Sequence, residues 1–224
     1  MLSFKSQNQV YSTTKIMKNT LYYVHDPMCS WCYAFKSVFK KLRQQLPTTI
    51  HFQSVIGGLA PDTKEAMPEE TKKRVQQSWR SIEKKCPDIK FNFDFWHKTT
   101  PIRSTYPACR ALLAAKQQGE KFEAMILEAI QTAYYHQAQN PALDETLFAC
   151  AQQIGLQISQ FKQDYASAFI EQQLQAELEL TDKLHVSSYP SLRLALGTSV
   201  WPIAIDYRDE KIILEEIERL LELS

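Results

Sequence analysis

Residues 20–32 read Thr20-Leu21-Tyr22-Tyr23-Val24-His25-Asp26-Pro27-Met28-Cys29-Ser30-Trp31-Cys32. The first six of these residues are mostly β-branched or aromatic, which is typical of a short buried strand. Pro27 has no backbone N–H to donate, so the strand is expected to end before it. Apolar side chains recur at helical spacing after Cys29. The two cysteines therefore lie where a strand gives way to a helix.

The residues after Cys32 predict that helix and then a second strand. Phe, Val and Leu side chains alternate at helical spacing with lysines and arginine, and Pro47 ends the pattern. Ile50–Ile56 alternates in polarity and stops at Gly57-Gly58. A strand, a helix and a strand joined by short links indicate a parallel βαβ unit.

The middle of the chain, Pro61–Leu184, is helical in character and rich in Ala, Gln, Glu, Leu and Lys. Prolines and glycines interrupt it at several points, so we expect several helices rather than one. The clearest helical patterns run over Ala108–Gln118, Lys121–Tyr135, Glu145–Gln153 and Ala168–Leu184.

Strand patterns return near the C-terminus. Ser191–Leu196 alternates in polarity, and Val200–Ile205 follows a glycine turn as its hairpin partner. Pro202 limits that partner to the edge of a sheet. Asp209–Leu223 then predicts an amphipathic helix. The order βαβ, helical block, ββα predicts an α/β protein with a mixed four-stranded sheet, similar to the thioredoxin fold, and a large all-helical insertion.

This order predicts two domains. Residues 19–60 and 186–224 would form the thioredoxin-like domain, and residues 61–185 would form the helical insertion. Residues 1–18 are polar and are expected to form a flexible leader, with Met17 as an alternative start.

The composition indicates a globular chain in water. Lys and Arg number 26 against 25 Asp and Glu, a formal net charge of +1, so there is no reason to expect a nucleic-acid partner. Hydrophobic residues make up 44% of the chain, but no apolar run approaches the roughly 20 residues of a membrane span. Five cysteines are too few for a disulfide-stapled secreted domain, and we see no secretory signal. We expect a cytoplasmic location and no membrane partner.

Cys29 and Cys32 form a Cys-x-x-Cys motif at the strand-to-helix junction. Unpaired N–H groups and the positive end of the helix dipole would stabilise a thiolate at Cys29, so we expect this sulfur to attack. Cys32 lies one helical turn further on, within reach of a disulfide with Cys29. We expect Cys32 to resolve the mixed disulfide that Cys29 forms with a substrate.

Two other interpretations of the motif stay open. Half of a zinc site would need a second pair of ligands. Cys86, Cys109 and Cys150 are each isolated, and no histidine lies two to five residues from any of them. Alternatively, the two cysteines could simply pack in the core, although their place at this junction would then be a coincidence. The pattern favours a redox dithiol with no metal.

A second candidate element, Ser188-Tyr189-Pro190, directly precedes the strand Ser191–Leu196. We expect a cis peptide bond before Pro190, facing the dithiol across the sheet edge. It would leave the N–H and C=O of Tyr189 free to pair with an extended substrate chain. An ordinary trans proline in a turn is the alternative.

Four side chains near the two elements are candidates for supporting roles. Trp31 beside the dithiol and Tyr189 before the proline are bulky aromatics that would contact a substrate or narrow its path. His25 or Asp26 would accept a proton from Cys32 or tune the acidity of the attacking thiol. The alternatives are a packed aromatic side chain, a strand-end histidine and a turn-forming aspartate.

Three segments, Tyr23–Cys32, Ser104–Ala111 and Ser188–Leu192, together with the helical block, resemble the DsbA family of thioredoxin-fold oxidoreductases. Within that family the chain is most similar to the FrnE-like group, described as predicted protein disulfide isomerases. The resemblance covers about Leu21–Leu223. The motifs that make it specific lie mainly near the two ends of that range, in Tyr23–Cys32 and Ser188–Leu192.

The resemblance implies roles for individual residues. Cys29 would be the nucleophile, Cys32 the resolving thiol and Pro190 the cis proline. The dipeptide between the cysteines is Ser-Trp here, whereas exported DsbA has Pro-His. We therefore expect a less oxidising site than that of DsbA, whose potential is about −120 mV.

Three functions follow from these features. The leading one is a thiol-disulfide oxidoreductase that reduces or isomerises disulfides in protein or small-molecule substrates, with glutathione as a candidate electron donor and no cofactor beyond the Cys29–Cys32 pair. The alternative is a glutathione-dependent transferase or isomerase of the kappa-class or 2-hydroxychromene-2-carboxylate isomerase type, whose members typically carry serine at the position of Cys29. The third is a non-catalytic binding module with an apolar groove at Trp31, Tyr189 and the helical block. The substrate, the direction of electron flow and the oligomeric state stay open.

Overall fold

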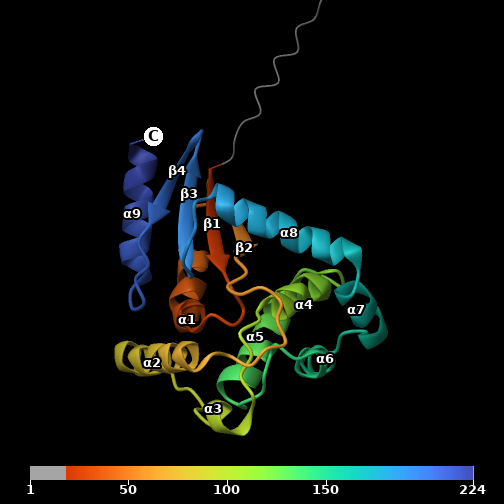
Figure 1. The fold of residues 1–224 in the computed structure, drawn as a ribbon. Coiled ribbons are helices and arrows are strands. Elements are labelled where there is room, and N and C mark those ends of the chain that lie inside the picture. The colour runs from red at the N-terminus through yellow and green to blue at the C-terminus, as the bar shows by residue number, and fades with distance from the viewer. Residues whose placement is uncertain (1–18, 224) are drawn as a thin grey trace, which may run out of the picture.

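The computed structural model describes residues 19–223, so the leader predicted for residues 1–18 lies outside the described part of the chain. The elements follow the predicted order of βαβ, helical block and ββα (Figure 1). They are β1 (Thr20–His25), α1 (Ser30–Gln45), β2 (His51–Ile56), α2 (Glu69–Lys85), α3 (Phe95–Lys98), α4 (Tyr106–Lys116), α5 (Lys121–Tyr135), α6 (Asp144–Gln153), α7 (Ile158–Tyr165), α8 (Ala168–Lys183), β3 (Ser191–Leu196), β4 (Ser199–Ile203) and α9 (Glu210–Glu222).

The four strands form one mixed sheet in the order β2-β1-β3-β4. β1 pairs in parallel with β2 and antiparallel with β3, and β4 lies at the edge, as Pro202 in its sequence predicts. In the β1–β3 ladder Val24 lies opposite Ser191. This register brings Pro190, the residue before β3, to the end of the sheet where β1 leads into Cys29.

Side chains of β1 alternate between the two faces of the sheet. Leu21 and Tyr23 belong to a core that α1 and α9 cover, whereas Val24 packs with Val55 of β2 and with Leu184 at the end of α8. Figure 1 shows α1 and α9 on one side of the strands and α8 crossing the other side. The fold is therefore a sheet between helices, as predicted.

The helices between β2 and β3 have a large hydrophobic core of their own. Trp79 of α2 is its centre, with a side chain 0% exposed. Its ring lies 4.8 Å from the Phe91 and Trp96 rings and 5.6 Å from the Tyr135 ring, measured between centroids. This core also takes in Met28, Ala34 and Ile56 from the sheet side of the chain. The predicted division into residues 19–60 with 186–224 and residues 61–185 stays a prediction. Within residues 19–223 no helix has the length and apolar character that crossing a bilayer requires.

Some predicted bounds are wrong by a few residues. α4 begins at Tyr106 rather than Ala108, because Pro107 fits the first turn of a helix, where its missing N–H would be unpaired anyway. β4 ends at Ile203 rather than Ile205. Helices α2, α3 and α7 were not among the clear helical patterns. The α2 sequence is polar, with only Trp79 and Ile82 buried, and the four and eight residues of α3 and α7 are too few for a periodic signal.

His25 ends β1 with its side chain buried in the sheet. Its Nε2 shares a 2.9 Å hydrogen bond with Ser54 Oγ of β2, and its ring stacks on the Tyr23 ring with centroids 4.9 Å apart. Burial lowers the pKa of His25 to about 4. The imidazole is therefore neutral at pH 7 and stabilises the sheet in that form.

Replacing Trp79 with alanine is expected to lower the free energy of unfolding by about 3–5 kcal/mol, because it empties the centre of the helical core. Trp201 of β4, 46% exposed, is the matched control, and its alanine variant should lose less than about 1 kcal/mol. Urea unfolding followed by circular dichroism measures both values. Equal losses in the two variants would contradict the described core.

The buried His25 predicts a specific response to acid. Its pKa is lower in the folded chain than in the unfolded chain. The stability that the neutral imidazole contributes is therefore fully present above about pH 6.5 and is lost as the pH drops towards 4. The loss amounts to about 3 kcal/mol at most. His25→Gln should remove this part of the pH dependence, measured by urea unfolding at pH 7, 5.5 and 4. If the free energy of unfolding of both proteins changes with pH in the same way, His25 is not buried in its neutral form.

Candidate active site around Cys29 and Cys32

Cys29 occupies the N-cap position of α1. Its backbone is extended, with φ −78° and ψ 113°, and its N–H donates to the Asp26 carbonyl over 3.1 Å to close the turn after β1. The Sγ atom accepts a 3.2 Å hydrogen bond from the Cys32 N–H. Cys29 thus lies one residue before the first turn of α1. As a result the sulfur itself caps the helix and meets one of the unpaired N–H groups.

Cys32 lies one turn deeper and is 3% exposed, against 6% for Cys29. Burial raises the pKa of the Cys32 thiol well above its usual value, and so do the hydrogen bond to Cys29 and the charges of Cys29 and Asp26. A hydrogen bond from the Asp26 backbone acts in the opposite direction. Cys32 therefore keeps its proton until a base close to it can take the proton up.

The peptide bond between Tyr189 and Pro190 is cis, in agreement with the prediction. The Tyr189 carbonyl oxygen lies 3.5 Å from Cys29 Sγ, which donates a hydrogen bond to it. These two residues are 160 positions apart in the chain and meet because of the β1–β3 register. A backbone acceptor thus lies directly beside the first sulfur.

The ring of Tyr189 is held against Gly57 at the end of β2. Its hydroxyl donates to the Gly57 carbonyl over 2.5 Å, and its Cε1 fills the space that a side chain at position 57 would need. Tyr189 was expected to contact a substrate or narrow its path, which stays a prediction. The structure holds its ring against Gly57, leaves the residue partly exposed and places its carbonyl oxygen at the sulfur.

Trp31 is partly exposed beside the dithiol, as expected. Its ring makes an edge contact with Tyr207, with centroids 5.1 Å apart, and the Lys85 ammonium lies 4.7 Å from the Tyr207 ring centroid. Burial raises the pKa of Tyr207, and so do the charges of Cys29 and Cys32. Tyr207 therefore lines the site next to Trp31. No local pattern in the loop between β4 and α9 pointed to it.

Asp26 is 0% exposed and lies in the turn between β1 and Cys29. Oδ1 accepts a 2.8 Å hydrogen bond from the Met28 N–H, and Oδ2 accepts one of 2.7 Å from the Leu59 N–H. Burial raises the pKa of Asp26, while the hydrogen bonds from Leu59, Thr105 and Met28 and the charge of Arg103 oppose that rise. Of the two residues expected to serve the thiols, Asp26 lies close enough for its charge to raise the pKa of Cys32. His25 instead bonds Ser54 within the sheet.

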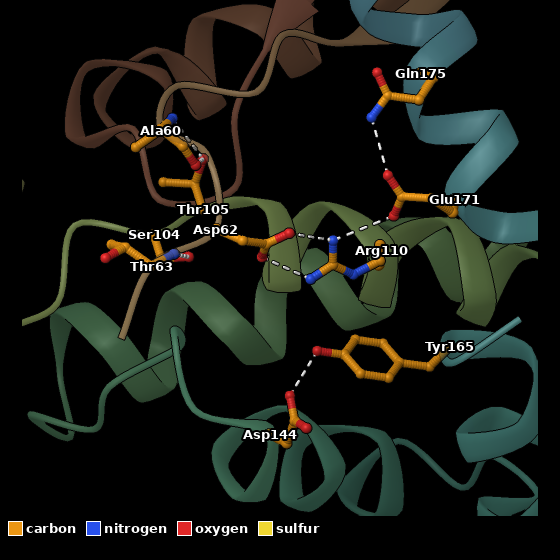
Figure 2. Close-up of polar contacts among 10 residues, drawn as sticks. All are labelled: Ala60, Asp62, Thr63, Ser104, Thr105, Arg110, Asp144, Tyr165, Glu171 and Gln175. Carbon is orange, nitrogen blue, oxygen red and sulfur yellow. Dashed lines mark hydrogen bonds and ion pairs between the residues drawn. The ribbon is translucent and has the colours of Figure 1, made fainter. Parts of the chain in front are cut away.

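Polar contacts fix α4 to the segment that follows β2, and Figure 2 shows them. Thr105 and Ala60 bond through backbone and hydroxyl groups, with Ala60 N–H to Thr105 Oγ1 at 3.1 Å. The Arg110 guanidinium forms two bonds to the Asp62 carboxylate, of 2.8 and 2.7 Å, and a weaker one to Glu171. These bonds hold the Leu59 N–H and the start of α4 in place around Asp26.

Metal ligation has no geometric basis in the described residues. Among residues 19–223, no group of three or more His, Cys, Asp or Glu side chains is arranged to hold a metal ion. Cys29, Cys32, Cys86, Cys109 and Cys150 are all free thiols.

Comparisons with known proteins place this geometry in a family. Residues 22–195 match a family model described as Thioredoxin. The ClpXP adapter protein SpxH of Halalkalibacterium halodurans is 25% identical over 175 residues, which are 76% of this chain and 56% of that protein. The chain thus spans just over half the length of the curated relatives it matches.

Solved structures share the fold over almost the whole chain. A “putative protein disulfide isomerase” from Nitrosomonas europaea superposes with a TM-score of 0.78 at 25% identity, over 92% of this chain and 98% of that one. Cytosolic disulfide reductase DsbM from Pseudomonas aeruginosa, solved without and with GSH, gives TM-scores of 0.70 and 0.68 at 20% and 19% identity. The two comparisons cover 92% and 90% of this chain and 100% and 98% of those. The expected DsbA-type arrangement is confirmed, and the chain belongs to the thioredoxin family.

Proposed function

We propose that the protein is a thiol-disulfide oxidoreductase that reduces or isomerises disulfide bonds through Cys29 and Cys32. The observation that carries the proposal is the position of the Cys29 sulfur. It caps α1, accepts the Cys32 N–H and lies 3.5 Å from the Tyr189 carbonyl oxygen. One sulfur at a helix N-terminus, a second one turn deeper and a backbone acceptor beside the first together suit exchange with an extended substrate.

In the reducing direction, the Cys29 thiolate attacks one sulfur of a substrate disulfide. The substrate S–S bond breaks, one substrate thiolate leaves, and a mixed disulfide joins the other half to Cys29. Cys32 then loses its proton, attacks Cys29 Sγ and releases the second thiolate. Two electrons pass to the substrate and the Cys29–Cys32 disulfide forms. The reverse sequence oxidises a substrate dithiol.

Asp26 is the proposed proton acceptor for Cys32. Its charge is close enough to raise the pKa of that thiol, and burial raises its own pKa above that of an exposed carboxyl. A proton acceptor works best when its pKa lies near that of the donor and near the operating pH. A buried carboxylate therefore suits this step better than an exposed one would.

The proposed substrate surface consists of the Tyr189 carbonyl with Pro190 on one side and Trp31 with Tyr207 on the other. It would accept a disulfide-bearing chain that pairs with the carbonyl and contacts the aromatic rings. In the cytoplasm, the location we propose, thiols are kept reduced by the glutathione and thioredoxin systems. GSH, present in a structure of DsbM with the same fold, is the candidate donor that re-reduces the pair.

A second candidate is an adapter function that needs no thiol chemistry. Its support is the relatives named ClpXP adapter protein SpxH. An adapter would bind purified ClpXP equally well as wild type and as a Cys29→Ser, Cys32→Ser double variant. A dithiol enzyme would instead lose its turnover in that double variant.

The Cys32→Ser variant is expected to trap the intermediate. After incubation with oxidised glutathione it should carry one glutathionyl group on Cys29, because the resolving sulfur is absent. Wild type should carry none, since Cys32 displaces the adduct. Intact-mass spectrometry and peptide mapping measure both results.

The matched variant Cys29→Ser keeps the deeper, protonated thiol and should acquire no adduct under the same conditions. Equal labelling of the two variants would contradict the assignment of Cys29 as nucleophile. Conjugation of glutathione to an electrophile that survives Cys32→Ser would instead favour the transferase alternative.

A further inference from the structure

Cys109 is a buried thiol that the exchange steps do not use. It lies in the first turn of α4 with a side chain 0% exposed. Its Sγ is 3.8 Å from Asp26 Oδ2, to which it donates a hydrogen bond. Burial raises the pKa of Cys109 far above its usual value, as does the charge of Asp26. The thiol is thus a permanent donor rather than a nucleophile.

Thr105, the N-cap residue of the same helix, is a second donor at this carboxylate. Its single hydroxyl proton has two acceptors within reach, the Asp26 carboxylate and the Ala60 carbonyl, the latter at 3.3 Å. Thr105 is buried as well, and its contacts with Ala60 are those drawn in Figure 2. The start of α4 therefore presents two side-chain donors to one buried acid, and the Arg110–Asp62 ion pair of the same helix holds them there.

The remaining groups that face Asp26 do not replace these donors. The charge of Arg103 favours the ionised form of Asp26 and lowers its pKa. Arg103 is partly exposed, however, so solvent screens that charge. The other titratable groups around the carboxyl, which come from α1, α5 and the loop before β3, are neutral in their usual state. They are Cys32, Tyr134, Tyr135 and Tyr189.

We propose that Cys109 and Thr105 are positioning residues that set the pH range in which Asp26 takes up the Cys32 proton. Cys109 donates to the ionised carboxylate, and the Thr105 hydroxyl is close enough to lower the pKa of Asp26 in the same way. A hydrogen bond to the charged form of an acid favours that form. Removing a donor makes Asp26 hold its own proton up to a higher pH. The resolving step would then need a higher pH. This inference rests on the proposed exchange by Cys29 and Cys32.

The test compares Cys109→Ala, Cys109→Ser and wild type in a single turnover with excess oxidised glutathione. Release of the second glutathione reports the attack of Cys32 on Cys29, and its rate is followed against pH. The midpoint of this rate–pH profile should rise by about 0.5 pH unit in Cys109→Ala. It should return towards the wild-type value in Cys109→Ser, whose hydroxyl restores a donor. Thr105→Val should shift it in the same direction. Asp26→Asn should remove the midpoint.

Cys150 of α6 supplies the matched control, since it is a second buried cysteine of the helical core that makes no contact with Asp26. Cys150→Ala should leave the midpoint unchanged. If Cys109→Ala loses stability in urea but keeps the wild-type midpoint, Cys109 only packs and the inference is overturned. If wild type releases no second glutathione at any pH, the proposed function fails instead.

Discussion

The hydrogen bonds of one buried carboxylate join the parts of the chain that the site needs. Asp26 accepts from Met28 in the turn before Cys29 and from Leu59 in the segment after β2, and α4 reaches it through Cys109. A carboxylate fully removed from water is tolerated only when its oxygens are hydrogen-bonded. The turn before Cys29, the segment after β2 and α4 must therefore keep their relative positions. The cysteine pair, which follows that turn, is held in place with them.

The site also lies where two hydrophobic cores meet. On α1, Ala34 packs into the helical core, whereas its neighbour Phe35 packs into the core of the sheet. The helix that begins at Cys29 is thus anchored on both sides, and its N-terminus has little freedom to move. This anchoring matters for chemistry, because a thiol exchange needs the attacking and resolving sulfurs to stay within reach of each other.

Local patterns were enough to predict the parts of the site that are close in sequence. The strand, the Cys-x-x-Cys motif and the helix follow one another directly, so Cys29 and Cys32 could be placed without knowledge of the fold. Pro190 was predicted because it precedes a strand in a chain that also carries the Cys-x-x-Cys motif. The donors to Asp26 were beyond such reasoning, since the Leu59 N–H is a backbone group 33 positions away. The same holds for Tyr189, whose ring direction depends on the missing side chain of Gly57.

The most direct test of the account is a redox titration of the purified protein in glutathione buffers, with quenched alkylation and mass spectrometry of each cysteine. The account predicts one reversible transition in which Cys29 and Cys32 lose their labels together. Its midpoint should lie below the roughly −120 mV of DsbA. Cys109 and Cys150 should be labelled to the same extent, after unfolding, at every buffer composition. A protein in which Cys29 and Cys32 never form a mutual disulfide would contradict the central claim.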